Sequence, residues 1–483
     1  MKNKVQLITY ADRLGGSNLR ELHRLLNGPF AGLFGGVHIL PFYYPIHGAD
    51  AGFDPIDHTQ VDPCLGSWAD VNELGQDMDL MADLIVNHVS SVSPQFVDYS
   101  EKSTSSLYNG LFLTMESVFP DGATEADLLN IYRPRPGLPF SYVTLKNGEK
   151  SLLWTTFTER QIDINVNHPL GQAYLKAVLQ TLHENNVRMV RLDAVGYAVK
   201  KAGTTCFMIP ETFAFIETLA QQAGKLGIEV LVEIHSHFRR QIEIAHQVDR
   251  VYDFALPPLV LHAIFNHTAR YLKQWLAISP RNAITVLDTH DGIGVIDIGA
   301  DNANPGLIPP EELDALVDKI HANSNGQSRQ ATGAAASNLD LYQVNCTFYG
   351  ALGRNDRDYL LARAIQFFAP GVPQVYYVGL LAGENDMTLL AKSGVGRDIN
   401  RHYFTPEEIH RAMQRPVVQS LFELIRFRNH HPAFDGSFSM PETYESGITM
   451  RWDNGANWAM LEVNFASGSY YISNSPFELL EPK

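Results

Sequence analysis

The sequence predicts an α/β fold: a (β/α)8 TIM barrel with two insertions at its rim and a small C-terminal antiparallel β domain. Eight short β-branched runs recur along the 483 residues, and amphipathic helical stretches follow most of them. Two of the gaps between runs are far longer than ordinary βα loops. Alternating short runs return after the last helical stretch, which indicates the separate β domain.

The eight predicted barrel strands lie at residues 5–10, 36–41, 81–86, 188–192, 229–233, 249–254, 283–288 and 372–378. Apolar residues recur at helical spacing between these runs. In residues 18–27 the shared apolar face carries Leu22, Leu25 and Leu26. In residues 211–227 it carries Phe213, Ile216, Ala220 and Ala223. Strand and helix therefore alternate, as a barrel of parallel strands requires.

The long gaps divide the chain into six predicted segments. Roughly a hundred residues separate the third and fourth strands, and roughly eighty separate the seventh and eighth. Both insertions leave the C-terminal ends of strands, where active sites of this architecture are built. The predicted segments are the first part of the barrel at 1–88, an inserted domain at 89–167, the continued barrel at 168–291, a second rim insertion at 292–355, the end of the barrel at 356–434 and the C-terminal β domain at 435–483.

Charge and composition limit the classes of partner that the protein is expected to bind and the cellular compartment in which it is expected. The chain carries 37 basic and 53 acidic side chains, and its net charge of −16 repels nucleic acid and anionic membrane surfaces. No apolar run reaches the roughly 18 residues of a membrane-spanning helix. The first residues, with Asp12 and Arg13, lack the apolar stretch of a signal peptide. Cys64, Cys206 and Cys346 form no CxxC pair, so we expect a reducing cytoplasm and no disulfide framework.

Charged residues end two neighbouring predicted strands. The strand period of two places Arg191 and Asp193 on one face, where the guanidinium keeps the carboxylate ionised, as a nucleophile requires. A structural ion pair is the alternative interpretation. Glu233 ends the next strand after aliphatic residues, and an apolar setting would keep it protonated, as a general acid requires. Its alternative is a carboxylate that caps the following helix.

Two further strand ends carry polar side chains. Asn87 and His88 follow the third strand, and His290 and Asp291 follow the seventh. The third-strand pair alone is compatible with a turn residue and a satisfied core histidine. Because the C-terminal ends of all barrel strands meet at one pocket, we expect these groups to converge there with the carboxylates of the fourth and fifth strands. Two carboxylates in different environments are the machinery of glycoside cleavage.

These segments resemble a known family. The stretches 83–88, 191–193, Glu233 and 290–291 are similar, in order, to the four signatures of the α-amylase family of retaining α-glycosidases and transglucosidases. Four longer stretches resemble the glucoside phosphorylases of that family: 48–58, 131–137, 332–345 and 396–403. The resemblance implies a glycosyltransferase without a cofactor. It implies the reversible phosphorolysis of sucrose to α-D-glucose 1-phosphate and D-fructose, through a covalent glucosyl-enzyme and with net retention.

The resemblance also implies a role for each candidate residue. Asp193 would be the nucleophile, Glu233 the general acid and base, and Asp291 the carboxylate that stabilises the oxocarbenium-like transition state. The residues implied to hold the glucosyl group are Asp50, Phe53, His88, Arg191, His290 and Arg397. The residues implied at the acceptor site for fructose or inorganic phosphate are Tyr132, Arg135, Asp340, Leu341 and Gln343. Tyr197 is a further substrate-binding residue that the resemblance implies.

Several alternatives remain open at this point. Phe53 is also compatible with ordinary core packing, and Arg135 with a solvated loop charge instead of a phosphate ligand. The alternative substrate is glucosylglycerol or a related α-glucoside. The alternative functions are a sucrose hydrolase or transglucosidase and a catalytically inactive sugar-binding subunit. Asp163 stands near a calcium position of some family members, but no oxygen ligands surround it at calcium spacing, so we expect no essential metal. A homodimer is left open.

Overall fold

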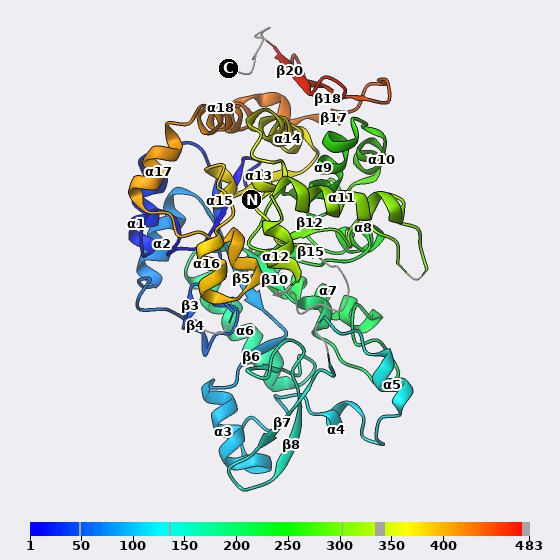
Figure 1. The fold of residues 1–483 in the computed structure, drawn as a ribbon. Coiled ribbons are helices and arrows are strands. Elements are labelled where there is room, and N and C mark those ends of the chain that lie inside the picture. The colour runs from blue at the N-terminus through cyan, green and yellow to red at the C-terminus, as the bar shows by residue number, and fades with distance from the viewer. Residues whose placement is uncertain (48–49, 135–136, 302, 334–342, 476–483) are drawn as a thin grey trace.

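A closed barrel of eight parallel strands lies at the centre of the molecule (Figure 1), which confirms the predicted fold class. The computed structural model describes residues 1–47, 50–134, 137–301, 303–333 and 343–475. The barrel strands are β1 (Gln6–Thr9), β2 (Gly36–Ile39), β5 (Asp79–Ile85), β10 (Val187–Asp193), β11 (Glu229–Val232), β12 (Arg250–Asp253), β13 (Ala283–Thr285) and β16 (Val372–Tyr376). They pair in chain order, and β16 closes the barrel on β1. Each strand overlaps one of the predicted runs.

Helices follow the barrel strands, and most of them bury one face. The main ones are α1 (Leu19–Asn27), α2 (Trp68–Asp77), α6 (Pro169–Glu184), α7 (Pro210–Lys225), α8 (Phe238–Ala245), α9 (Leu256–Asn266), α10 (Arg270–Ile278), α14 (Asp356–Phe368) and α18 (Pro416–His430). Helices α9 and α14 are instead buried on nearly all sides. Helix α1 begins where the Asn18 side chain accepts a hydrogen bond from the Glu21 backbone N–H at 3.0 Å. It buries Leu22 and Leu26, two of the three leucines that the sequence pattern placed on its inner face. None of the described helices has both the length and the apolar character needed to cross a membrane.

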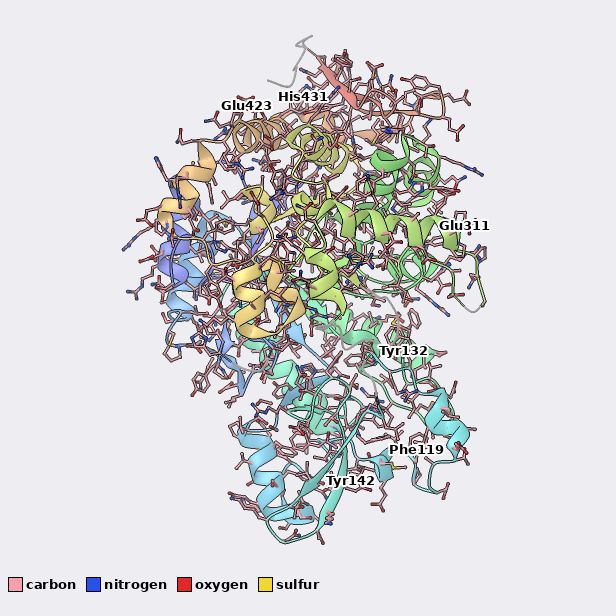
Figure 2. All side chains as sticks on the ribbon, viewed as in Figure 1. Phe119, Tyr132, Tyr142, Glu311, Glu423 and His431 are labelled. Atoms are coloured by element: carbon pink, nitrogen blue, oxygen red, sulfur yellow. The ribbon has the colours of Figure 1, made fainter. Side chains whose placement is uncertain are left out.

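The stretch between β5 and β10 forms a lobe at one end of the molecule (Figure 1). It contains β6 (His88–Ser90), α3 (Pro94–Lys102), α4 (Met115–Val118), α5 (Glu125–Asn130), β7 (Phe140–Thr144), β8 (Lys150–Trp154) and β9 (Gln161–Asp163). Figure 2 places Phe119 and Tyr142 within this lobe and Tyr132 nearer the barrel. Strand β6 pairs with β9, opposing His88 to Asp163, so both ends of the lobe are joined next to the barrel.

The stretch between β13 and α14 contains β14 (Ile293–Gly294), α11 (Pro310–Asn323), α12 (Gln327–Gly333), β15 (Gln343–Val344) and α13 (Phe348–Ala351). The short elements elsewhere are β3 (Tyr43–Tyr44), β4 (Asp57–Val61), α15 (Tyr377–Leu380), α16 (Met387–Ser393) and α17 (Pro406–Met413). The C-terminal sheet is antiparallel, with β17 (Ser437–Ser439), β18 (Gly447–Asn454), β19 (Asn457–Asn464) and β20 (Ser469–Asn474) in that order. Strand β17 has only three residues, which are too few for an alternating pattern in the sequence. The six segment boundaries drawn from the sequence remain a prediction.

Alternation along the strands separates the inside of the barrel from its helix-covered outside. One buried cluster joins Met81, Met189, Leu231, Tyr252, Phe254, Ile284 and Val286 from five neighbouring strands. Two residues beyond Met189, Arg191 lies on the same face and approaches the carboxyl ends of the strands. Asp253, between Tyr252 and Phe254, lies on the opposite face. Its carboxylate accepts hydrogen bonds from Trp275 Nε1 at 2.9 Å and from the Leu256 backbone N–H at 3.0 Å.

The buried carboxyl group of Asp253 predicts how the free energy of unfolding depends on pH. Burial raises the pKa of Asp253 from 3.8 to about 7, and its hydrogen bonds offset only part of this shift. The folded state therefore binds the proton more tightly than the unfolded state, and the free energy of unfolding falls as pH rises toward 7. We expect Asp253→Asn to reduce the loss of stability between pH 5 and pH 8 by about 2 to 3 kcal/mol. Urea unfolding of both proteins at the two pH values measures this, and an unchanged difference would contradict the assignment.

Candidate active site

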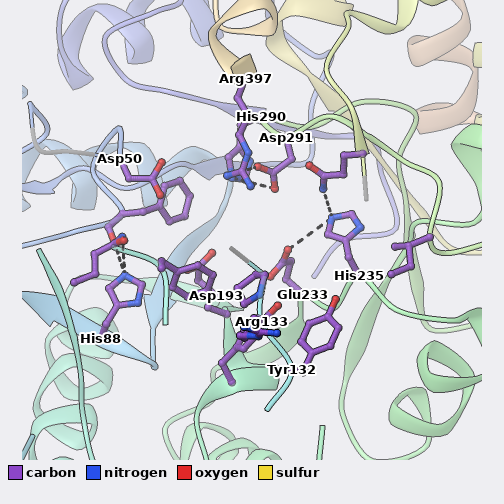
Figure 3. A pocket seen from close by; sticks show the side chains of 18 residues that line it. Asp50, His88, Tyr132, Arg133, Asp193, Glu233, His235, His290, Asp291 and Arg397 are labelled. Atoms are coloured by element: carbon purple, nitrogen blue, oxygen red, sulfur yellow. Dashed lines mark hydrogen bonds and ion pairs between the residues drawn. The ribbon is translucent and has the colours of Figure 1, made fainter. Parts of the chain in front are cut away.

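A pocket opens at the carboxyl ends of the barrel strands (Figure 3). Its volume is about 1070 Å³ including the open mouth, which is the size of a small-molecule site. The predicted residues that line it are Asp50, Phe53, His88, Tyr132, Asp193, Tyr197, Glu233, His290, Asp291, Gln343 and Arg397. Arg191 lies beneath Asp193, with its side chain 2% exposed. Arg135, Asp340 and Leu341 lie outside the described residues.

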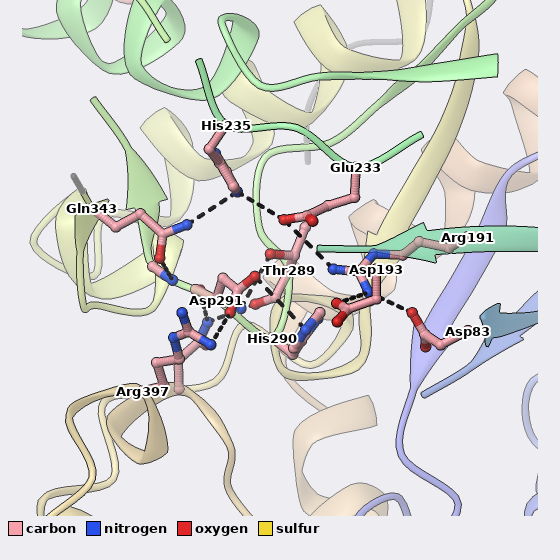
Figure 4. Close-up of polar contacts among 12 residues, drawn as sticks. Asp83, Arg191, Asp193, Glu233, His235, Thr289, His290, Asp291, Gln343 and Arg397 are labelled. Carbon is pink, nitrogen blue, oxygen red and sulfur yellow. Dashed lines mark hydrogen bonds and ion pairs between the residues drawn. The ribbon is translucent and has the colours of Figure 1, made fainter. Parts of the chain in front are cut away.

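Arg191 brings the carboxylates of three strands together (Figure 4). Its Nη1 donates to Asp83 Oδ1 and, at 2.9 Å, to Asp193 Oδ1. Its Nη2 lies 3.7 Å from Glu233 Oε1. The strand register explains this arrangement, because Arg191 is opposite Asp83 on β5 and opposite Leu231 on β11, and Glu233 is two residues beyond Leu231. Burial lowers the pKa of Arg191, but the surrounding carboxylates raise it further, so the guanidinium remains charged.

Asp193 and Glu233 compete for this one positive charge. Burial raises the pKa of Asp193 well above its usual value; Arg191 opposes the shift, and Glu233 and Asp83 add to it. The direct hydrogen bond from Arg191 favours the negative charge on Asp193, because Arg191 makes no bond of comparable length to Glu233.

Asp291 is the carboxylate that remains ionised in this pocket. Arg397 Nη1 lies 2.9 Å from Asp291 Oδ1. Burial raises the pKa of Asp291, but the guanidinium groups of Arg397 and Arg191 outweigh it and hold the pKa far below its usual value. The pocket therefore holds a permanent negative charge at Asp291, next to the carboxyl groups of Asp193 and Glu233.

His290 and Phe53 form one wall of the pocket. Their rings stack with centroids 5.0 Å apart and an interplanar angle of 10°. Burial lowers the pKa of His290 well below its usual value, so its imidazole is neutral. Its Nδ1 is buried and has no hydrogen-bond partner among the described residues. On the opposite side His88 Nε2 lies 2.9 Å from the Phe53 carbonyl oxygen and 3.1 Å from Gln161 Nε2.

Sequence reasoning missed several lining residues: Arg133, Pro134, Phe157, Gln161, Ala194, His235 and Ile296. Phe157 and Gln161 come from the lobe, and Phe157 packs edge-on against His88 with centroids 5.5 Å apart. Tyr132 stacks on Phe207 at 4.3 Å, which in turn lies 4.6 Å from Tyr197. These contacts join segments far apart in the chain, and no local motif marks them. His235 was detectable, because it is two residues after Glu233 and therefore on the same side of the strand end.

The described residues contain one group with the spacing of metal ligands. Atoms of Glu233, His235 and Asp291 lie within 4.8 Å of one another. Arg191 and Arg397 already place positive charge against the two carboxylates, at 3.7 and 2.9 Å, and this disfavours a cation between them. The group fits proton transfer better than metal binding.

Asp163 faces an ammonium group. Lys200 Nζ lies 2.7 Å from Asp163 Oδ2, donates to Asn87 Oδ1 at 2.7 Å and also donates to the Tyr197 carbonyl oxygen. The Lys200 side chain is 1% exposed. The Lys200 ammonium group thus contacts one oxygen each from the barrel, the lobe and the loop after β10. These contacts connect the lobe to the barrel.

We expect Lys200→Met to destabilise the protein by about 3 to 5 kcal/mol, because it leaves the buried Asp163 carboxylate without its counter-ion. Lys201→Met is the matched control. Lys201 is 57% exposed and pairs with Glu211, so its loss should change the free energy of unfolding by about 0.5 kcal/mol or less. Urea unfolding of the three proteins gives the comparison, and equal effects of the two substitutions would refute a structural role of the buried lysine.

Known proteins resemble this chain over its whole length. Residues 34–253 match the alpha amylase catalytic domain. A sucrose phosphorylase of Agrobacterium vitis is 60% identical over 476 residues, which cover 98% of this chain and 98% of that protein. One of Bifidobacterium adolescentis is 53% identical over 484 residues, which cover 100% of this chain and 96% of that protein.

A solved structure agrees with these sequence matches. The crystal structure of sucrose 6F-phosphate phosphorylase from Thermoanaerobacter thermosaccharolyticum has a TM-score of 0.92 and 39% identity, and covers 99% of this chain and 97% of that chain. The resemblance found in the sequence is confirmed, and the chain belongs to the sucrose phosphorylase group of the α-amylase family.

Proposed function

We propose that this protein catalyses the reversible phosphorolysis of sucrose, giving α-D-glucose 1-phosphate and D-fructose with retention of configuration. The observation that carries the proposal is the pair Asp193 and Glu233, which end adjacent strands and face the same guanidinium in one pocket. Retaining glycosidases use two carboxyl groups about 5 to 5.5 Å apart, one as nucleophile and one as acid and base. The names of the 60% and 53% identical relatives support sucrose as the donor.

In the first step Asp193 attacks the anomeric carbon of the glucosyl unit. The bond to the fructosyl oxygen breaks, and Glu233 gives this oxygen its proton, so fructose leaves and a β-glucosyl ester forms on Asp193. Nucleophilic attack needs the ionised form of Asp193, which the hydrogen bond from Arg191 stabilises. Asp291, held ionised by Arg397, stabilises the positive charge that develops on the sugar ring.

In the second step phosphate attacks the same carbon from the face that fructose left. Glu233 takes the proton of the attacking phosphate oxygen, the ester bond to Asp193 breaks, and α-D-glucose 1-phosphate forms. The two inversions give net retention. Asp50, His88, His290 and Arg397 line the pocket, and we expect them to bind the glucosyl hydroxyls.

Incubation with sucrose and inorganic phosphate tests the proposal. Stoichiometric glucose 1-phosphate and fructose, both dependent on phosphate, are the expected products. Free glucose without glucose 1-phosphate would identify a hydrolase, and faster phosphate-dependent release of glycerol from glucosylglycerol would identify the alternative donor. No turnover of either glucoside would favour a sugar-binding subunit. A homodimer and a cytoplasmic location remain predictions from the sequence.

Arg135 is the residue that we expect to favour phosphate over water. A guanidinium binds phosphate through two charge-assisted hydrogen bonds, which offset the unfavourable field of a chain with net charge −16. Arg135→Ala should raise KM for phosphate at least about tenfold, while hydrolysis persists because the three carboxylates are untouched. Gln343→Ala should act in the same direction but less, since a neutral amide binds an anion more weakly. The ratio of glucose to glucose 1-phosphate at fixed phosphate measures both, and an unchanged ratio in Arg135→Ala would place phosphate elsewhere.

A further inference from the structure

A buried carboxylate stands behind the acceptor side of the pocket. Asp297 is 0% exposed, and its Oδ2 lies 3.0 Å from His235 Nδ1. The other ring nitrogen, His235 Nε2, lies 3.0 Å from Gln343 Nε2 and 3.7 Å from Glu233 Oε1 (Figure 4). Phe254 stacks on the imidazole at 3.8 Å with an interplanar angle of 15°, which fixes the plane of the ring. Asp297 therefore connects through His235 to the proposed acid and base and to a proposed acceptor-site residue.

The hydrogen bonds that link Gln343, His235 and Asp297 all point the same way, from donors on the Gln343 side to acceptors on the Asp297 side. Gln343 Oε1 accepts from the Gly292 backbone N–H at 3.2 Å, so its amide nitrogen must donate to His235 Nε2. His235 then carries its proton on Nδ1 and donates it to Asp297. The second oxygen, Asp297 Oδ1, accepts from the Ser236 backbone N–H at 3.2 Å and from Gln241 Nε2 at 2.9 Å. Only this tautomer of His235 pairs every donor of the hydrogen-bond network with an acceptor.

The backbone at Gly294 packs closely against the hydrogen bond between Asp297 and His235. A Cβ atom at Gly294 would lie 2.4 Å from Asp297 Oδ2 and 3.1 Å from His235 Nδ1. Gly294 is paired with Gln343 across β14 and β15, so the same short sheet that carries Gln343 covers the hydrogen bond. Only glycine fits here, which indicates a contact that the fold is built to keep.

We propose that Asp297 is a positioning residue: it fixes the Nδ1–H tautomer of His235 and thereby holds Gln343 in one hydrogen-bonding orientation toward the acceptor. The inference rests on the proposed function. In this state the lone pair of His235 Nε2 accepts one N–H of the Gln343 amide, and the second N–H of that amide can donate to an incoming phosphate or fructose. The carboxylates that face His235 are Asp297, Glu233 and Asp291; burial lowers the pKa of His235, but these groups, Asp297 first, raise it.

Asp297→Asn tests the tautomer without changing the shape of the side chain. The asparagine amide has only one oxygen. The Ser236 backbone N–H and Gln241 Nε2, which bond Asp297 Oδ1 in the wild type, hold this oxygen at the Oδ1 position. The asparagine NH₂ group then faces His235 Nδ1 and forces the proton to Nε2, where it meets the Gln343 amide, a second donor. We expect kcat/KM for phosphate to fall at least about tenfold. The pH dependence of kcat/KM should move toward lower pH, because the imidazolium loses its main counter-ion.

A matched control separates positioning from stability. Gln241→Met also removes a hydrogen bond from Asp297 but leaves the bond to His235. We expect it to lower the melting temperature while its pH profile stays that of the wild type. In a His235→Asn background, Asp297→Asn should have little further effect on kcat/KM. Independent, additive losses, or a Gln241→Met profile shifted as in Asp297→Asn, would overturn the proposal.

The tautomer can also be read directly in the wild type. Nitrogen-15 spectra of histidine-labelled protein, with the His235 signals identified by their loss in His235→Asn, should show the proton on Nδ1. A proton on Nε2 would overturn the inference even if Asp297→Asn does not fold. The two proposals fail separately: a wild type that forms no glucose 1-phosphate contradicts the proposed function, whereas the spectra decide the role of Asp297 in either case.

Discussion

Asp193→Asn is expected to reduce phosphorolysis of sucrose at least about 10⁴-fold, equivalent to about 5.4 kcal/mol of transition-state stabilisation. The amide cannot form the glucosyl ester on which both half-reactions depend. It also removes the negative charge that pairs with Arg191 at 2.9 Å. Initial rates of fructose release measure the loss, and intact-protein mass spectrometry after brief mixing with sucrose measures the covalent species.

The covalent species distinguishes a nucleophile from a structural carboxylate. The wild type should show an added glucosyl mass without phosphate present, and Asp193→Asn should show none. Asp57→Asn, on β4 outside the lining of the pocket, should keep both the rate and the adduct. A glucosyl adduct on Asp193→Asn would show that another residue is the nucleophile, and the pair would have to be reassigned.

Local periodicity predicted the parts of the site that depend on single strands. The period of two placed Arg191 and Asp193 on one face of β10, and the structure joins them by a hydrogen bond. The rule that strand ends of a barrel converge placed Glu233 and Asp291 at the same pocket, where both lie. These inferences needed only the covalent geometry of a strand and the closure of a barrel.

The remaining parts depend on packing between distant segments, which no local pattern encodes. The register of β14 on β15 opposes Gly294 to Gln343, and this long-range pairing brings Gln343 to His235. For the same reason the sequence did not reveal Lys200 as the partner of Asp163, since the lobe between β5 and β10 must fold back before the two meet. The case of Arg135 differs from both of these, because it lies outside the described residues and its role remains a prediction.

Glu233→Gln is expected to lose about 10² to 10⁴-fold with sucrose, because fructose is a poor leaving group without a proton donor. A glucosyl donor whose leaving group departs without protonation should still glucosylate the enzyme, since Asp193 and Arg191 remain paired. α-Glucosyl fluoride is such a donor. The first half-reaction should therefore recover with this substrate, while release of the sugar remains slow, because the amide cannot take a proton from the acceptor.

Azide distinguishes the two roles of Glu233. It is a small anionic nucleophile that carries no proton to be removed, so it should accept the glucosyl group from Glu233→Gln without a base. We expect azide to accelerate turnover of α-glucosyl fluoride by this variant and to give α-glucosyl azide, because azide enters on the acid side of the pocket and displaces the β-ester on Asp193 with inversion. Asp193→Asn should gain nothing from azide by this route, as it forms no ester. Equal inactivity of both variants with fluoride and azide would mean that the roles of Asp193 and Glu233 are misassigned.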